Sequence, residues 1–303
     1  MNPVSNLAKT LTEGKLVLTT RLSFPPDVNV EDIRKKARLF KDYTAVIAGE
    51  ENSTDLNISS LALAIIFKEE GIEPILQINS RDKNRIAIQK EILTAICLGV
   101  NNIFTLSGIH PYTDKNLGTK TVYDLEPINM VAVMKKIRDE RKLPDGKDEN
   151  LNADIFIGIE DNPLAEPINA MPLFLDKKIR AGADFILTYP IFDIQKFKNY
   201  VDKIKILCSL DEINLIATIY IANSIEDIDN LKKSYPGVSI PQSILDNIEN
   251  IDISENSGIE IAFGISESLK KFNCVKGFNL LSNNNFDSMI ELSKKILDSN
   301  KYS

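Results

Sequence analysis

The sequence is poor in the residues that build metal centres and disulfide frameworks. It has one histidine, His110, and three widely spaced cysteines, Cys97, Cys208 and Cys274, with no Cys-x-x-Cys spacing. A histidine-rich metal site is therefore excluded, and an iron–sulfur or zinc site is not expected. Isolated cysteines of this kind are typical of a reducing compartment.

The chain also lacks long apolar runs and an excess of positive charge. No run is long enough to cross a bilayer, and the polar segment "MNPVSNLAKTLTEGK" has no signal-peptide core. The formal net charge is -7 over 303 residues. Broad binding to nucleic acid or to a membrane surface would need a basic patch, which this balance does not favour. We expect a soluble cytoplasmic protein with neither partner.

What the sequence does contain is an alternation of short apolar runs with amphipathic helical patterns. The runs are continuous rather than alternating, as in parallel strands that are buried on both faces. Helical patterns lie between them, for example over residues 59–70, 82–98 and 172–181. The predicted strands cover residues 15–20, 44–48, 74–78, 102–106, 154–159, 184–188, 214–219 and 277–281.

Three glycines, Gly71, Gly99 and Gly182, stand between a helical pattern and a strand, where glycine closes a helix in the left-handed conformation. Eight strand–helix units in a chain somewhat longer than the ~250 residues typical of the fold predict an α/β (β/α)8 TIM barrel. We expect one domain over residues 1–303 with an N-terminal helix, and a surface loop over 139–154. An open doubly wound sheet would need a Gly-rich first turn, and "TTRLSFPPD" is not one.

In such a barrel the active site lies at the carboxyl ends of the strands. The residues at the ends of the predicted strands and just after them form a polar, hydrogen-bonding set, with no convincing nucleophile–base pair and no dense carboxylate cluster for a metal. They suit a large heteroaromatic ligand better than hydrolysis. The set comprises Thr20, Arg21, Glu50, Gln77, Asn79, Arg81, Asp82, Ser107, Gly108, His110, Glu160, Asn162, Thr188, Tyr189, Ile219, Tyr220, Asn279 and Ser282.

Each of these residues also has a structural interpretation. Arg81 and Asp82 could form a helix cap with an ion pair, and Gly108 could be only a turn residue. A lone histidine such as His110 is more often a surface residue than a catalyst. Lys178 could belong to a solvated, charged helix face.

Five segments along the chain have a recognisable order and spacing. They are "SSLALAIIFKEEGIEPILQI", "RDKNRIAIQKEILTAICLGVNNIFTLSG", "GIEDNPLAEP", "LDKKIRAGADFILTYPIFD" and "YPGVSIPQSIL". Together they resemble the methylenetetrahydrofolate reductase family nearly end to end, a family of flavin-containing (β/α)8 barrels that interconvert methylene- and methyl-tetrahydrofolate. The resemblance implies FAD as cofactor, with FMN or no flavin as alternatives, and a folate or pterin substrate.

The resemblance also implies roles by position. Lys178 would meet the flavin phosphates, where a cation is favourable. Arg81 and Asp82 would flank the site. The flavin-binding face would include Gln77, Ser107 and Gly108, and the implied substrate-binding positions are Arg21, Asn162, Tyr189 and Asn279.

The chain departs from the family at its centre. The family's glutamate before Pro-Pro, which is thought to protonate the pterin, is replaced by Arg21 or Leu22, neither of which is an acid at neutral pH. Ile109 replaces an aspartate in the turn after the fourth strand. The remaining candidates for acid catalysis are His110 and Glu50. At two of the implied substrate-binding positions, this chain has Tyr189 where the family has a glutamine and Asn279 where it has a histidine.

Three hypotheses follow. The first is a divergent methylenetetrahydrofolate reductase that takes electrons from a nicotinamide, from ferredoxin or from a partner subunit. The second is a flavin-free folate- or pterin-binding relative with other one-carbon chemistry, such as methyl transfer. The third is a non-catalytic subunit, in which case the chain would assemble as a hetero-oligomer; the first two are also compatible with a homo-oligomer.

Overall fold

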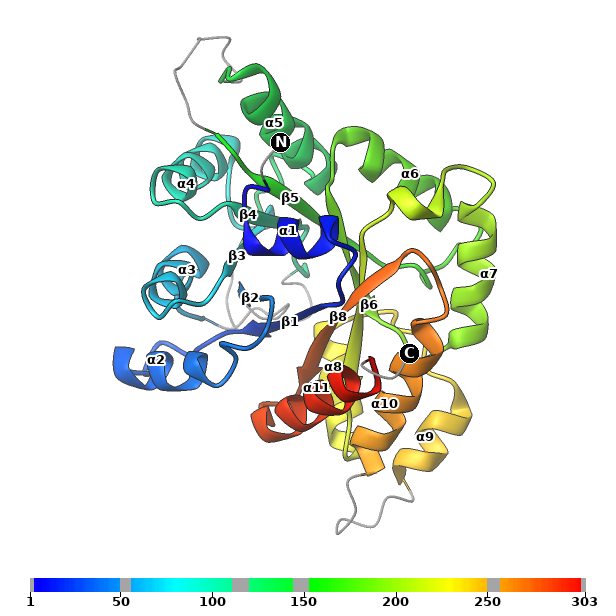
Figure 1. Ribbon diagram of the computed structural model, residues 1–303. Helices are drawn as coiled ribbons and strands as arrows, with labels where there is room; N and C mark the ends of the chain where they lie inside the picture. The colour runs from blue at the N-terminus through cyan, green and yellow to red at the C-terminus, as the bar shows by residue number, and fades with distance from the viewer. Residues whose placement is uncertain (1–2, 50–55, 111–119, 144–152, 250–256, 301–303) are drawn as a thin grey trace. The chain divides into compact units, whose positions relative to one another are not determined.

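The computed structural model describes residues 3–49, 56–110, 120–143, 153–249 and 257–300. Within these ranges, eight strands form a closed barrel in the order of the sequence (Figure 1). The pairs β1–β8, β2–β3, β3–β4, β4–β5 and β7–β8 are parallel. The strands are β1 (Val17–Leu22), β2 (Ala45–Ala48), β3 (Pro74–Asn79), β4 (Asn102–Leu106), β5 (Phe156–Asp161), β6 (Phe185–Pro190), β7 (Leu215–Ile221) and β8 (Val275–Ser282). The predicted (β/α)8 TIM barrel is confirmed.

Helices separate the strands, and one more precedes the first strand as predicted. Among the described residues, no helix combines the length and the apolarity needed to span a bilayer. The helices are α1 (Asn6–Thr12), α2 (Val30–Arg38), α3 (Ser60–Glu69), α4 (Arg85–Cys97), α5 (Pro127–Glu140), α6 (Met171–Ala181), α7 (Ile194–Ile204), α8 (Ile225–Ser234), α9 (Gln242–Glu249), α10 (Ser257–Leu269) and α11 (Phe286–Asn300), with a 3-10 turn, η2 (Leu210–Glu212).

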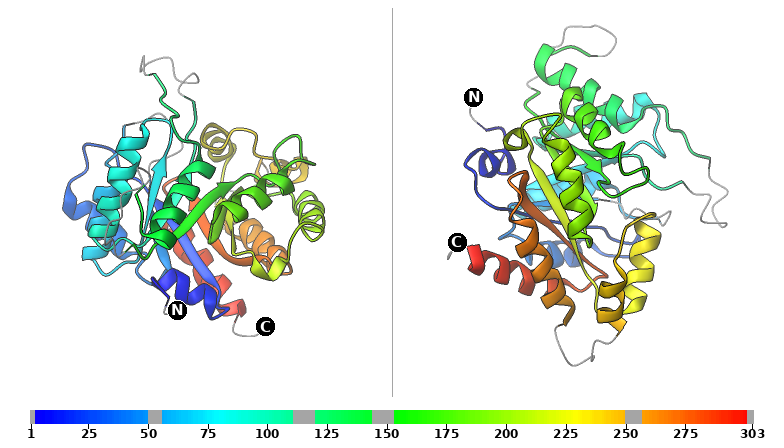
Figure 2. Two further views of the ribbon diagram at one scale, coloured as in Figure 1. Left: turned by 90° about the horizontal axis from the view of Figure 1, so that it is seen from above. Right: turned by 90° about the vertical axis from the view of Figure 1, so that its right-hand side faces the viewer.

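The strands form because their residues are apolar on both faces. Every residue of β2, β3 and β4 is buried, including the polar ones. Helix α3 packs against β2 and β3, and α5 packs against β4, while the opposite faces of these strands line the barrel interior. Figure 2 shows the ribbon from two further sides. This is why their sequences are continuous apolar runs without alternation.

Glycines end three of the helices as expected. Gly71, Gly99 and Gly182 have φ angles of 75°, 68° and 115°, which side chains with a Cβ atom rarely adopt. Each glycine follows α3, α4 or α6 and leads into the next strand. The glycine signal therefore located three helix–strand junctions correctly.

The predicted strand bounds differ from the observed ones by up to two residues, and two further predictions differ more. Helix α4 begins at Arg85, not at residue 82, because the side chain of Asn84 accepts a hydrogen bond from the Ala87 N–H and so caps the helix. Helix α5 extends to Glu140, into the stretch predicted as a loop, and residues 144–152 lie outside the described residues.

The contacts group the residues into two compact units. Unit 1 contains Met1–Lys15, Arg21–Glu160 and Lys177–Ile186; unit 2 contains Leu16–Thr20, Asp161–Asp176 and Leu187–Ser303. In unit 2, α10 packs on β7 and α11, and α11 packs on β8. The single domain expected from the sequence stays a prediction.

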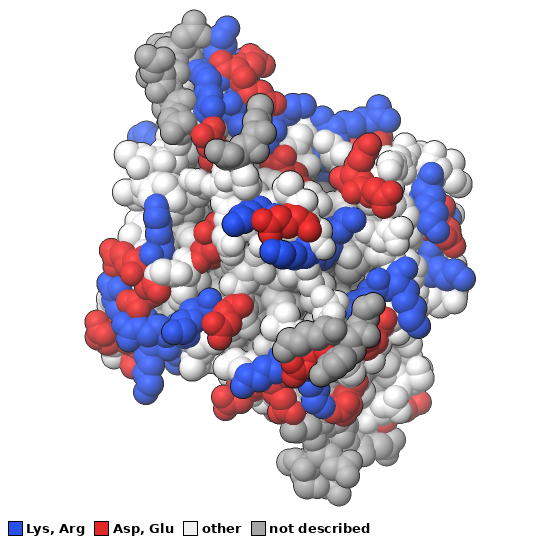
Figure 3. All heavy atoms as spheres, viewed as in Figure 1, with Lys and Arg blue, Asp and Glu red and all other residues white. Residues whose placement is uncertain are grey.

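Charged side chains of both signs are interspersed on the face seen in Figure 3. Many are paired. The Arg34 guanidinium lies 2.6 Å from the carboxylates of both Glu69 and Glu70, and Arg38 lies 2.5 Å from Glu70. In this group α2 supplies the arginines, and the glutamates lie at the C-terminal end of α3, so the charges join two neighbouring helices.

Candidate functional site

Arg81 is the centre of the polar residues that follow β3 in unit 1. Its side chain is largely buried, and its guanidinium makes two hydrogen bonds to Asp82, 2.7 Å from Nε to Oδ1 and 2.8 Å from Nη2 to Oδ2. A paired geometry of this kind fixes both groups more firmly than a single contact. Asp82 remains about one-third exposed, so a fixed carboxylate faces solvent at this end of the strand. The predicted ion pair is confirmed, whereas the predicted helix cap is wrong.

Arg81 also holds the turn after β4. Its Nη1 donates to the Ile109 carbonyl at 3.2 Å, and its own carbonyl accepts from the Val122 N–H at 2.8 Å. Gly108 has φ of 78°, and a Cβ atom there would lie 3.0 Å from the Arg81 Cβ. The glycine is therefore needed both for its conformation and for the close approach of Arg81. Sequence position alone predicted that Arg81 and Gly108 are neighbours, and the structure brings them together.

Tyr123 joins this group from a segment that the sequence did not single out. Its hydroxyl donates to the Gly108 carbonyl at 3.3 Å, and its ring stacks near His110, with centroids 6.2 Å apart. Burial raises the pKa of the Tyr123 hydroxyl, and the charge of Arg81 opposes that change. The hydroxyl therefore stays protonated at neutral pH and acts as a donor. The backbone of Tyr123 has a φ of 42°, which is unusual for tyrosine, and no pattern in the sequence predicts this conformation.

Of the two residues proposed for acid catalysis, the structure describes only His110. His110 is exposed, at the end of the described segment that contains Ser107 and Gly108, and Ser107 is exposed too. Glu50 lies outside the described residues.

A second contact in unit 1 joins the ends of β1 and β3. Gly49, just after β2, has so little space around it that a Cβ atom would lie 2.6 Å from the Gln77 Oε1 and 2.9 Å from the side chain of Arg21. Arg21 and Gln77 therefore both pass over the backbone of Gly49. The sequence predicted both residues for the site but not Gly49, although a glycine directly after a buried strand was the available signal.

Lys178 lies apart from these residues in its local structure. It is half-buried in the last turn of α6, ahead of β6, and its carbonyl accepts from the Ala183 N–H at 3.2 Å. The other cofactor-binding candidates all lie in strands β3 and β4 or in the turns that follow them. The prediction that Lys178 meets a phosphate stays a prediction.

In unit 2, buried polar side chains connect three strands. Asn279 on β8 accepts from the Thr19 hydroxyl and donates to the Thr218 hydroxyl, each at 3.2 Å. The three residues occupy matching register positions on β1, β8 and β7. Because two of the hydrogen-bonding positions of the Asn279 amide are thereby used, its primary structural task is to join these strands.

The remaining substrate-binding candidates lie after β5 and within β6. Asn162 accepts from the Leu164 N–H at 3.3 Å, so its side chain shapes the loop that it begins. Tyr189 is half-buried and packs edge-to-face on Tyr235, with centroids 5.0 Å apart. Neither contact prevents the exposed part of these side chains from touching a ligand.

Asp161, at the end of β5, is used within the protein. The Tyr200 hydroxyl of α7 donates to its carboxylate at 2.8 Å, and both residues are almost fully buried. Burial and the nearby Asp161 charge raise the pKa of the Tyr200 hydroxyl well above its usual value. No three His, Cys, Asp or Glu side chains are grouped for metal binding in the part of the chain that the structure describes.

Comparison with known proteins gives a family. The model of the family "Methylenetetrahydrofolate reductase" matches residues 25–297. A protein of Caenorhabditis elegans described as "Probable methylenetetrahydrofolate reductase (NADPH)" is 25% identical over 277 residues. The match covers 88% of this chain and 39% of that protein, so the chain spans well under half of the relative's length.

Solved structures show the same fold. A Clostridium thermocellum protein that binds two copies of 5-methyl-5,6,7,8-tetrahydrofolic acid superposes with a TM-score of 0.68 at 14% identity, over 96% of this chain and 99% of that one. A riboflavin lyase with modified FMN and riboflavin has a TM-score of 0.56 at 11% identity, over 94% and 92%. At these identities the likeness concerns the fold.

Proposed function

Since the chain belongs to the methylenetetrahydrofolate reductase family, we propose that it is a divergent, flavin-dependent enzyme that interconverts 5,10-methylene- and 5-methyl-tetrahydrofolate. The observation that carries this proposal is the family match over residues 25–297, which includes all of the residues assembled around Arg81. A flavin would supply the hydride that the methylene group accepts.

The unit 1 residues have the chemistry to hold a flavin. Arg81 and Asp82 present fixed donors and acceptors next to a glycine turn, which lets the backbone of Gly108 approach a flat ligand closely. The residues proposed to contact the cofactor are Gln77, Arg81, Asp82, Ser107, Gly108, Lys178 and, from the structure, Tyr123. FAD is the first choice and FMN the second.

The substrate candidates are Arg21, Asn162, Tyr189 and Asn279. Arg21 offers a guanidinium for a carboxylate or a pterin oxygen, and Tyr189 offers a ring face. His110 is proposed as the proton donor, because its exposed imidazole follows the Gly108 turn and a ring nitrogen can donate a proton. Glu50 stays the second candidate. The electrons would come from a nicotinamide, ferredoxin or a partner subunit.

A flavin-free folate-binding protein is the second candidate function. Two observations favour it: the residues Arg21 and Ile109 stand where the family carries acids, and the Clostridium thermocellum neighbour binds two copies of a methylated folate. In that case methyl transfer or a non-catalytic role in a complex would replace reduction.

The visible absorption spectrum of the purified protein tests the proposal, before and after incubation with FAD or FMN and desalting. We expect retained flavin absorbance, and a weaker retention in Gln77→Leu than in the wild type. Gln195→Leu is the matched control, because Gln195 is an exposed residue of α7. A colourless protein that takes up neither flavin, but binds 5-methyl-tetrahydrofolate in calorimetry, would reject the reductase in favour of the flavin-free candidate.

A further inference from the structure

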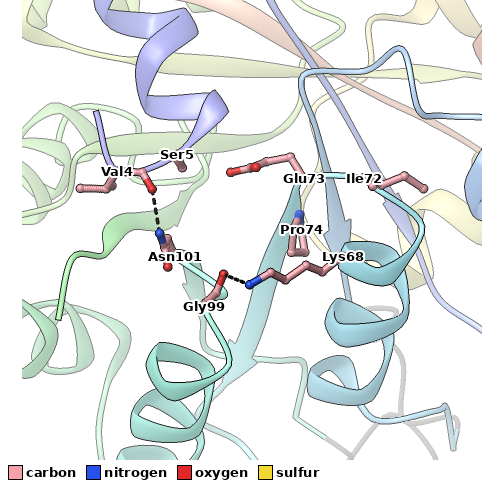
Figure 4. A pocket seen from close by; sticks show the side chains of 9 residues that line it. Val4, Ser5, Lys68, Ile72, Glu73, Pro74, Gly99 and Asn101 are labelled. Atoms are coloured by element: carbon pink, nitrogen blue, oxygen red, sulfur yellow. Dashed lines mark hydrogen bonds between the residues drawn. The ribbon is translucent and has the colours of Figure 1, made fainter. Parts of the chain in front are cut away.

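A pocket lies in unit 1 at the amino-terminal ends of β3 and β4, opposite to the strand ends described above. It has a volume of about 260 Å³. Its walls come from the segment before α1, from the C-terminal ends of α3 and α4, and from the starts of both strands (Figure 4). Nothing in the proposed function uses it.

One wall carries a fixed ammonium group. The Nζ of Lys68 donates to the carbonyls of Leu98 and Gly99, each at 2.7 Å. These are carbonyls at the C-terminal end of α4, where a cation is favoured. An ammonium has three hydrogens. The two hydrogen bonds fix the position of Nζ and leave its third hydrogen for another acceptor.

The opposite wall carries the Glu73 carboxylate. Its Oε1 accepts from the Asn102 Nδ2 at 2.7 Å, and the Asn6 backbone N–H also donates to the carboxylate. Burial outweighs these bonds and the charge of Lys68, and it raises the pKa of Glu73. A positive group in the pocket would therefore be stabilised by this carboxylate.

Asn102 holds the Glu73 carboxylate in place without lining the pocket itself. The Nδ2 of its amide donates to Glu73 and to the Pro74 carbonyl, which fixes the orientation of the amide. A carboxylate has two oxygens with about four acceptor positions, so Glu73 can still accept from further donors in the pocket.

The backbone adds to the same preference. Gly71 and Gly99, which end α3 and α4, both line the pocket. The C-terminal end of a helix carries a partial negative charge; Lys68 already lies on that of α4, and the end of α3 favours a further cation. Val4 and Ile72 also line the pocket, on opposite sides of it (Figure 4).

We propose that this pocket binds a small free amino acid, with its ammonium on Glu73 and its carboxylate on Lys68. A primary ammonium has the three donors that the acidic wall lacks, and a carboxylate accepts the remaining hydrogen of Lys68. The opposite charges on two walls select a zwitterion over a simple amine or acid.

Calorimetric titration of the full chain with three matched probes tests this assignment. L-leucine carries both charges, isopentylamine lacks the carboxylate, and 4-methylpentanoate lacks the ammonium. We expect leucine to bind most tightly and each of the other two to bind roughly tenfold or more weakly, because each loses a charge-assisted hydrogen bond. Equal affinity for leucine and either analogue, or no binding of leucine, would overturn the assignment.

Variants locate the binding. Glu73→Gln and Lys68→Gln should each weaken leucine binding roughly tenfold, whereas Glu69→Gln should leave it unchanged, since Glu69 pairs with Arg34 outside the pocket. Circular dichroism checks that each variant is folded, and Lys68→Gln keeps the test open if Glu73→Gln does not fold. Leucine binding that is the same in all three variants would also overturn the proposal.

Discussion

Gly158 on β5 lies directly against the aromatic ring of Phe185 on β6, in the interior of unit 1. The ring is further held by stacking with Phe156, with centroids 5.3 Å apart. A Cβ atom on residue 158 would collide with three ring atoms of Phe185, and a buried, stacked ring has little freedom to move away. The absence of a side chain at this position thus sets the approach of two strands.

We therefore expect Gly158→Ala to lower the free energy of unfolding by about 1–3 kcal/mol, the usual effect of overpacking. Gly264→Ala is the matched control. Gly264 is exposed inside α10 with no atom near its would-be Cβ, and alanine there should raise stability by about 0.5–1 kcal/mol. Urea denaturation measures both, and equal effects of the two substitutions would contradict this explanation.

Glu73 gives a second prediction at the residue scale. Because burial raises its pKa above the unfolded value, its contribution to stability is fully present below the unfolded pKa and is lost as pH rises through the folded one. Glu73→Gln removes this loss and keeps an oxygen for the Asn102 amide. The variant should gain stability over the wild type at pH 7, and the gain should shrink toward pH 4.

Chemical denaturation at the two pH values measures the gain. Glu69→Gln serves as the control, since Glu69 is exposed and no buried carboxylate is altered. A difference between Glu73→Gln and the wild type that stays constant with pH would show that ionisation of Glu73 is not its cause.

The site residues that sequence could predict share one property. Arg81 and Gly108 each follow an apolar run, and the carboxyl ends of parallel strands meet at one end of a barrel. Tyr123 belongs to the same group but precedes a helix, and its contact with Gly108 depends on a backbone φ that leaves no trace in the sequence. The sequence thus predicts which residues follow a strand, but it does not predict which residues of a long connection return to the site.

At the scale of elements, all eight strands were predictable because burial on both faces demands continuous apolar residues. The first residues of the helices were harder to predict. Charged residues at 81 and 82 resemble a helix start, but the side chain of Asn84 provides the hydrogen bond that begins α4. The competition among several capping residues is decided by tertiary contacts of Arg81 and Asp82, which the sequence does not show.

The cap of α4 can be tested directly. Asn84→Ala should cost about 1 kcal/mol of unfolding free energy, because the Ala87 N–H loses its acceptor. Asn84→Asp keeps the acceptor and adds a charge that the helix N-terminus favours, so it should be close to neutral or stabilising. Urea denaturation distinguishes them; an equal loss in both variants would point to a different function of Asn84.

At the scale of the whole molecule, the three cysteines differ in burial, so their reactivity measures unfolding. Cys97 is exposed on α4, whereas Cys274 is fully buried next to β8, where burial raises its pKa to about 11. Reactivity needs both access and a thiolate. A maleimide pulse without denaturant should therefore label Cys97 and spare Cys274, as read by peptide mass spectrometry.

Labelling of Cys274 should rise only through the denaturant range in which circular dichroism reports unfolding. Rapid labelling of Cys274 in native buffer would mean that the start of β8 opens locally, contrary to its burial. Cys208 is partly buried and should react at an intermediate rate, which provides an internal comparison.

The hydrogen bond between Thr19 and Asn279 joins residues 260 positions apart in the chain. A ribosome that adds 5–20 residues per second needs roughly 13–52 s to make the intervening chain. Throughout that time the β1 edge that will pair with β8 has no partner strand, and unpaired edges invite association with other chains. The pairing of β1 with β8 is thus the last strand pairing of the barrel to form, and the edge of β1 is exposed to aggregation for longer than any later strand edge.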